Sequence, residues 1–296
     1  MKRSILNSPR LLELKKYRRK IFLGKVALYV CAFLLIFSGL AYVSRVSALN
    51  INSIEVTGNR VIDVETVKMI AAGEIAGYYL WIFPKTNILF YTKNNIKNVL
   101  ENDFARLQNV NLSIKEGRIL KIDLVERMVK YTWCENALDS VVELPDGDTS
   151  SKKDKCYFMD AEGYVFDEAP YFSGEVYFKF YGSTDSNLDE PSGSYFLKEN
   201  FEKLISFKKT LEDINLKPVA LYKKENGDIE LFLSRGSPIS VGPKIIFKID
   251  SDLQKIAENL ETILHTEPLQ TDLKTKYSSL LYIDLRFGNR VYYKFK

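Results

Sequence analysis

The stretch VALYVCAFLLIFSGLAYVS, residues 26–44, decides how this chain is organised. It holds nineteen consecutive uncharged residues and is bounded by Lys25 and Arg45. A helix needs about 20 apolar residues, at about 1.5 Å each, to cross a bilayer, where it satisfies its own backbone hydrogen bonds. The stretch therefore predicts one membrane-spanning helix, assigned to residues 26–45. A buried core helix is less favoured because such helices are usually amphipathic. A signal peptide usually has a shorter apolar region, although the small residues that follow leave cleavage open.

The flanking charges predict the orientation of this helix. Residues 1–25 contain nine Lys or Arg and one acid, Glu13, so this segment carries a net charge of +8. Basic segments beside a span stay in the cytoplasm. We therefore expect a basic cytoplasmic tail over residues 1–25, with the chain from about residue 46 onward outside the cytoplasm. A nucleic-acid site is the alternative for a basic run, but the position against an apolar span favours topology.

The exported part of the chain differs from the tail in charge. The whole chain carries +4 and the tail +8, so residues 26–296 sum to −4. The sequence pI of about 8.7 thus reflects the tail, and no nucleic-acid partner is expected. The length remaining outside suits one or two domains with their own cores.

The cysteines and the single histidine bear on covalent and metal chemistry. Cys134 and Cys156 lie in the exported part, where disulfides persist, and each adjoins a strand-like run. We favour a Cys134–Cys156 disulfide over two free thiols, whereas Cys31 is a small apolar residue of the span. With one histidine, His265, and no CxxC spacing, the sequence predicts no metal site and no cofactor.

Residues 49–127 have the pattern of a small α/β domain. A stretch of alternating apolar and polar residues, which predicts a strand, ends at Gly58-Asn59. Asp63 precedes a first helical pattern, and a second helix is expected over 92–102. Two further alternating stretches, one on each side of Glu116-Gly117, predict two strands. The expected order is β-α-α-β-β. The connection YYLWIFPKTNILFY, residues 78–91, is aromatic. We expect its rings to enter the core, with an exposed patch as the alternative. These rings are Trp81, Phe83 and Phe90.

From residue 128 to 296 the sequence predicts a mixed antiparallel β domain with two helices. The helices are expected over 197–216 and from Asp252 to His265, and Asn226-Gly227 is a strong hairpin signal. Asp160 and Glu162 fall in a four-residue turn, which predicts solvated turn residues rather than an acid–base pair. The fold class expected for the whole chain is α+β behind one N-terminal transmembrane helix.

The first exported unit resembles a POTRA domain, through IEVTGNRVIDVETV at 54–67 and IKEGRILKIDLVER at 114–127. With CYFMDAEGYVF at 156–166, SPISVGPK at 237–244 and YIDLRFGNRVYYK at 282–294, the whole chain resembles the FtsQ/DivIB cell-division proteins. The departures from that family are the cysteine pair and an insertion over 135–155.

The resemblance implies a non-enzymatic divisome scaffold in the inner membrane, enriched at the septum. It implies FtsB/DivIC-like and FtsL-like partners beside the lipid bilayer, and no small-molecule substrate. A last strand has no successor in the chain, so its outer edge is open to a partner's strand. The residues expected to contact a partner are Arg286, Phe287, Val291, Tyr292, Tyr293 and Phe295.

Two alternative functions are considered. A membrane-anchored POTRA docking protein in secretion or envelope transport lacks support, because neither a C-terminal barrel pattern nor further POTRA repeats occur. An anchored cell-wall enzyme lacks a nucleophile motif and metal-ligand spacing.

Overall fold

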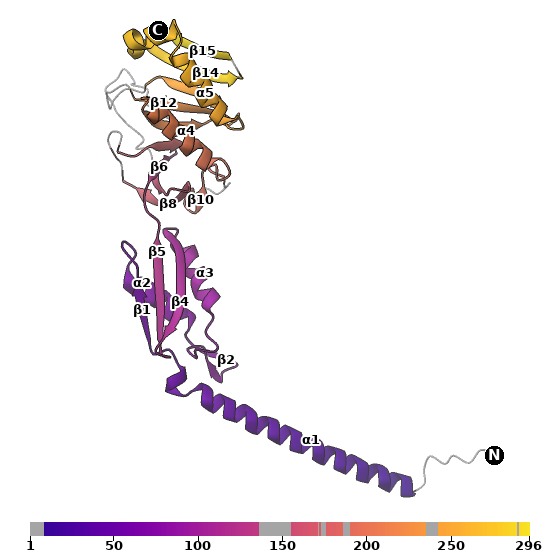
Figure 1. Ribbon diagram of the computed structural model, residues 1–296. Coiled ribbons are helices and arrows are strands. Elements are labelled where there is room, and N and C mark those ends of the chain that lie inside the picture. The colour runs from indigo at the N-terminus through magenta and orange to yellow at the C-terminus, as the bar shows by residue number, and fades with distance from the viewer. Residues whose placement is uncertain are drawn as a thin grey trace, which may run out of the picture. The chain divides into compact units, whose positions relative to one another are not determined.

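The computed structural model describes residues 9–135, 155–170, 172, 176–185, 190–234, 242–288 and 290–296, with side chains from Glu13 onward (Figure 1). The chain divides into two compact units after Glu126, and it is a mixed α+β protein with a long N-terminal helix. The insertion expected at 135–155 lies almost wholly outside the described residues.

The N-terminal helix, α1 (Pro9–Ser44), is longer than the apolar stretch. Proline at its first position fits a helix start, because the missing N–H is one that a helix leaves unpaired. No proline follows Pro9 in this segment, and the helix continues through Gly24 and the basic residues into the uncharged span. The helix is long and apolar enough to cross a membrane.

The first unit pairs three strands with two helices behind a short 3-10 helix, Ser47–Leu49. Its sheet has the order β1-β5-β4, in which β1 is parallel to β5 and β4 is antiparallel to it. Between the two helices lies a two-stranded hairpin, β2-β3. The elements are β1 (Ser53–Thr57), α2 (Val64–Glu74), β2 (Tyr78–Tyr79), β3 (Phe83–Pro84), α3 (Lys93–Asp103), β4 (Leu107–Lys115) and β5 (Ile119–Glu126).

The apolar periodicity of both helices forms the core of this unit. Val67 and Ala71 of α2, and Ile96 and Leu100 of α3, are fully buried together with the inward side chains of β4 and β5. Burying a side chain the size of Val, Ile or Leu contributes about 1.5–3 kcal/mol. Asp63 caps α2 by accepting the N–H of Thr66 at 2.8 Å.

Two aromatic side chains of the connection 78–91 are placed differently from our expectation. Trp81 and Phe90 are exposed rather than in the core. The core prediction was therefore wrong for these two rings, because the two helices and β5 fill the interior of the sheet face without them. Phe83 is half-buried.

The second unit is built on one ten-stranded sheet, in the order β10-β8-β7-β6-β9-β11-β12-β13-β14-β15. Three of its pairs are parallel, namely β6-β9, β9-β11 and β13-β14. Its strands are β6 (Tyr131–Cys134), β7 (Cys156–Met159), β8 (Tyr164–Ala169), β9 (Lys179–Tyr181), β10 (Ser194–Tyr195), β11 (Pro218–Lys223), β12 (Asp228–Leu233), β13 (Lys244–Lys248), β14 (Leu280–Phe287) and β15 (Arg290–Phe295).

Helices α4 (Phe201–Asp213) and α5 (Leu253–Leu264) lie side by side on one face of this sheet (Figure 1). Their apolar faces meet the inward side chains of the strands in one core, which includes Phe180, Leu231 and Phe247. A third helix, α6 (Leu269–Lys276), and the 3-10 helix Tyr277–Ser279 follow α5. The sequence pattern did not predict α6, because this eight-residue helix buries only Leu269 and so carries almost no apolar periodicity.

The adjacent residues Glu126 and Arg127 each stabilise a different unit. The buried Glu126 carboxylate accepts backbone N–H groups of Arg60, Val61 and Ile62 at 2.6 to 3.0 Å. Burial raises the Glu126 pKa, but these bonds outweigh it and hold the pKa below its ordinary value. Glu126 thereby fixes the turn that leads into α2.

Arg127 belongs to the second unit and pairs with Asp160 at 2.6 Å. Asp160 is buried, and it also accepts the N–H groups of Glu162 and Tyr164. Our prediction that Asp160 is a solvated turn residue was therefore wrong, since the arginine covers the turn and neutralises its carboxylate. The arginine also lies over the Tyr164 ring, at 3.7 Å from its centroid.

Gly58 gives a test of the first unit. Its φ is +83°, and an added Cβ would lie 2.1 Å from the Leu124 carbonyl oxygen. We expect Gly58→Ala to destabilise this unit by more than about 1 kcal/mol, through backbone strain and the clash. Hydrogen exchange of the β4 and β5 amides measures this, with the amides of the second unit as an internal reference.

The matched control is Gly73→Ala in α2, where an added Cβ meets no atom within 4 Å. This substitution should stabilise the unit by about 0.5–1 kcal/mol. Equal exchange rates in Gly58→Ala and the wild type would contradict the described turn.

Candidate functional site

The C-terminal strand β15 forms one edge of the ten-stranded sheet. It pairs with β14 on one side, and among the described residues no strand pairs with its other side. The opposite edge of the sheet is β10, which has two residues against six in β15. Because an unpaired edge presents a row of free N–H and C=O groups, β15 is the longer template in this unit for a polypeptide in extended conformation.

Side chains of β15 alternate between the core and solvent. Val291, Tyr293 and Phe295 pack against the core. Tyr292 is exposed on the other face, between the exposed cations Arg290 and Lys294. The six candidate contact residues of the sequence therefore separate, with Val291, Tyr293 and Phe295 holding the strand in place and Tyr292 facing outward.

Phe287 and Tyr292 form an exposed aromatic pair. Their ring centroids are 5.2 Å apart in an edge-to-face arrangement, and 55% and 48% of the two residues' surfaces are exposed. Phe287 ends β14, and Gly288 follows it with a φ of +67° in the turn into β15. Paired exposed rings beside an open strand edge are typical of side chains that dominate a protein interface.

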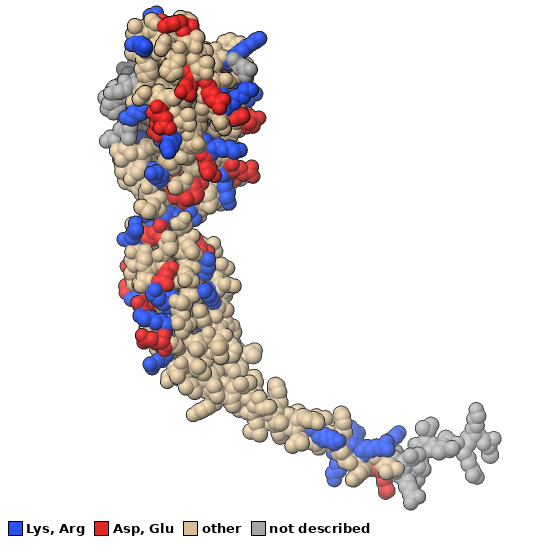
Figure 2. Space-filling view, viewed as in Figure 1, with Lys and Arg blue, Asp and Glu red and all other residues tan. Residues whose placement is uncertain are grey.

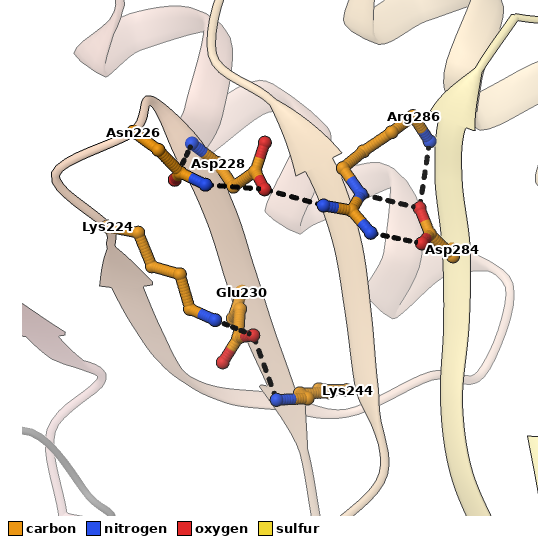
Figure 3. A network of polar contacts seen from close by, with 7 residues as sticks. All are labelled: Lys224, Asn226, Asp228, Glu230, Lys244, Asp284 and Arg286. Atoms are coloured by element: carbon orange, nitrogen blue, oxygen red, sulfur yellow. Dashed lines mark hydrogen bonds and ion pairs between the residues drawn. The ribbon is translucent and has the colours of Figure 1, made fainter.

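Arg286 is engaged within the chain. Its Nε and Nη2 donate to the two carboxylate oxygens of Asp284, at 2.9 and 2.6 Å. Its Nη1 donates to Asp228 Oδ2 at 2.6 Å, across the end of β13 (Figure 3). The hydrogen bonds from Arg286 use three of the five guanidinium N–H groups, so the described role of Arg286 is to join β12 to β14 rather than to present an unpaired cation.

A second ion pair cluster lies on β12, β13 and the turn between β11 and β12. Glu230 of β12 is buried and accepts from Lys224 at 2.7 Å and from Lys244 at 2.8 Å (Figure 3). Asn226 in the preceding turn donates to Asp228 at 3.1 Å. The network of these seven residues balances three cations with three acids, and it comprises Lys224, Asn226, Asp228, Glu230, Lys244, Asp284 and Arg286.

The pKa values of the network follow from these contacts. Burial raises the pKa of Glu230 and of Asp284, but the hydrogen bonds from Lys224 and Lys244, and from Arg286, outweigh burial and hold both carboxyl pKa values below their ordinary range. The bond to Asp284 in turn raises the pKa of Arg286. All three groups are therefore charged over the physiological range.

Sequence reasoning did not identify this network. The signal that was available is the alternation in DIELFL, residues 228–233, where the two acids fall on the same face of a strand whose other residues are apolar. Acids on a strand that is buried throughout need cationic partners. Which lysine or arginine would supply them depended on the sheet order, since Arg286 lies 58 residues away from Asp228.

Cys134 and Cys156 are joined by a disulfide, as neighbours in the β6-β7 pair. Cys134 is buried with Tyr181, Ala220 and Phe232 in a small cluster. Closing a loop of this length stabilises by about 3 kcal/mol in the chain-entropy model. The bond ties together the two strands on either side of the insertion.

No group of three His, Cys, Asp or Glu side chains that could hold a metal occurs in the part of the chain that the structure describes. His265 caps the C-terminal end of α5. In comparisons with known proteins, no family model matches the chain and no curated protein shows significant similarity to it.

Glu230 yields a pH-dependent prediction. A carboxyl whose folded pKa is lowered contributes stability that is full above its unfolded pKa, near 4.5, and is lost as the pH falls through the folded value. We expect Glu230→Gln to lower the free energy of unfolding of the second unit by about 1–3 kcal/mol at neutral pH. The difference from wild type should shrink in acid.

The measurement is urea unfolding followed by Trp133 fluorescence in a Trp81→Phe background, at neutral and acidic pH. Glu199→Gln is the control, since Glu199 is exposed. The described network would be contradicted if the difference in unfolding free energy between Glu230→Gln and the wild type stayed constant with pH. It would also be contradicted if Glu199→Gln lowered the unfolding free energy as much as Glu230→Gln.

Proposed function

We propose that the chain is a non-enzymatic divisome scaffold of the FtsQ/DivIB type, anchored in the inner membrane by α1. In this proposal the basic tail lies in the cytoplasm and both folded units lie outside it, enriched at the division septum. The supporting features are the long apolar helix behind a basic segment, the order of the first unit, which is β-α-α-β-β apart from the added β2-β3 hairpin between its helices, and the large sheet of the second. The first unit would then be a POTRA-type docking domain.

The observation that carries the proposal is the open edge of β15. A strand of an FtsB/DivIC-like or FtsL-like partner would add to this edge by backbone hydrogen bonds. The aromatic pair Phe287–Tyr292 would supply the apolar anchor. Exposed Arg290 and Lys294 would favour a partner strand with acidic residues at the matching positions.

The longest edge strand of the first unit, among the described residues, is β4, and its chemistry differs. The outer edge of β4 carries exposed Gln108, Asn109 and Asn111 and no exposed aromatic side chain. Polar edges are typical of strands that avoid pairing with another chain. This contrast is why we place the principal partner contact at β15.

Capture of a partner tests the edge. The double variant Phe287→Ala, Tyr292→Ala should weaken binding of an FtsB-like partner at least about tenfold, because hot-spot rings each contribute about 2 kcal/mol or more. Both rings are exposed, so the fold should persist, as thermal unfolding can check. Arg286→Glu is a poor test, since it would place a third acid between Asp228 and Asp284.

The control for capture is Val176→Ala, which truncates another exposed apolar side chain of the second unit. It should leave the affinity unchanged. Wild-type affinity in the double variant would contradict docking at β15.

Localisation tests the cellular role separately. A fluorescent protein fused before residue 1 should concentrate at midcell in dividing cells. A fusion that ends at residue 45 should stay spread over the membrane, because it retains only the tail and the span. A uniform envelope signal from the full chain would argue against a divisome role and favour another docking function.

A further inference from the structure

The β2-β3 hairpin of the first unit exposes large apolar side chains at its tip. Trp81 is 94% exposed and Leu80 is 75% exposed. Nearby in the same connection, Leu89 is 76% exposed. Lys85 is the only charged residue in the connection 77–91. Several large apolar side chains exposed so close together are typical of a surface that contacts a protein or a membrane.

The backbone at the tip has a conformation that these residues disfavour. Leu80 and Trp81 have φ values of +49° and +62°, and the turn closes through the Ile82 N–H to the Tyr79 carbonyl at 3.0 Å. Two positive φ values at the centre of a hairpin turn usually require Asn or Gly. Leu80 and Trp81 are bulky and apolar, and burial within the chain does not offset the cost of this conformation. We take this as a sign that something outside the chain covers them.

Hydrogen bonds connect this hairpin to the end of α1. The Asn87 side chain, which is buried, donates to the Ser44 carbonyl at 3.0 Å. The Ile88 N–H donates to the Leu49 carbonyl at 2.9 Å, and Arg45 Nε donates to the Ile82 carbonyl at 3.3 Å. The last carbonyl of the apolar helix is thus satisfied by the connection that carries the exposed rings.

Ring contacts place the hairpin beside the uncharged part of α1. Phe83 of β3 meets Phe37 of α1, with centroids 5.5 Å apart, and Phe90 meets Phe83 at 5.7 Å. Phe37 precedes Arg45 by eight residues, or about 12 Å along the helix. The hairpin therefore lies beside the last two turns of the span. In the view of Figure 2, the uncharged surface runs from α1 into this part of the first unit.

We propose that the β2-β3 hairpin inserts into the outer interfacial layer of the bilayer that α1 crosses, with phospholipid as the occupant of the patch. The inference rests on the proposed membrane span. Trp and Tyr rings sit at the level of lipid headgroups, where an apolar body and a polar tip are both satisfied. Lys85, whose Nζ lies 5.6 Å from the Tyr79 ring centroid, supplies a cation for lipid phosphate. The hairpin is then a second membrane contact, which holds the first unit against the bilayer surface.

The chain's two tryptophans make this testable. Trp133 is buried in the second unit, where its Nε1 donates to the Gly182 carbonyl at 2.9 Å. The full chain is reconstituted in vesicles of phosphatidylethanolamine and phosphatidylglycerol, with or without phosphatidylcholine brominated high on one acyl chain. The fluorescence emission of the wild type is compared with that of Trp81→Phe. The variant's emission comes from Trp133, and the difference between the two proteins comes from Trp81.

Brominated lipid should quench the Trp81 emission strongly and leave the Trp133 emission unchanged, while aqueous iodide should quench neither. Trp81 quenched by iodide and not by brominated lipid, in protein that floats with the vesicles, would overturn the inference and leave the span intact. Trp81 protected from both quenchers would assign the patch to a protein, such as a second copy, and would also overturn it. Protein that fails to float with the vesicles would overturn the span and the inference together.

Discussion

The bridge from Arg286 to Asp228 is the contact on which the C-terminal edge of the second unit depends. Strands β13 and β14 are parallel and in register over only three positions, from Lys244 to Ile246. The hairpin β14-β15 therefore has a short seam to the rest of the sheet. By reaching across β13 to β12, the guanidinium joins the last hairpin to a strand two places away. Because the Arg286 side chain is part-exposed and ion pairs near a surface add little net stability, we infer that the bridge mainly fixes the position and register of the edge.

This arrangement separates the residues that hold the edge from those that a partner would meet. Val291, Tyr293 and Phe295 are committed to the core, and Arg286 is committed to two carboxylates. What remains outside is the backbone of β15, its flanking cations and the rings of Phe287 and Tyr292. A pre-positioned edge loses little conformational entropy when a strand adds to it, so the ordering cost falls mainly on the partner. The candidate site is thus a backbone edge held by core side chains, with a small aromatic anchor.

Local sequence signals predicted the parts of this fold that depend on neighbours in the chain. The uncharged run gave the long helix, Asp63 gave a helix cap, and Asn226-Gly227 gave the hairpin between β11 and β12. Features that depend on distant partners were not predictable in the same way. The partner of Asp228 lies on a strand whose place follows only from the sheet order, and Asp160 is buried because Arg127, 33 residues earlier, covers it. Composition also misplaced Trp81, because ring-rich connections usually supply core residues.

Exposed rings occur in both units, and their surroundings distinguish what should cover them. At the tip of the β2-β3 hairpin, apolar side chains project from a closed turn that lies against an apolar helix. Lipid can cover such side chains, because Leu80 needs no hydrogen bond and the Trp81 indole N–H can donate to the headgroup layer. At β15 the rings adjoin a strand edge that pairs with no further strand in the part of the unit that the structure describes. Lipid tails cannot satisfy the backbone groups of such an edge, whereas an extended polypeptide satisfies them and buries the rings at once. The same residue types therefore support the proposed bilayer contact at one position and the proposed partner strand at the other.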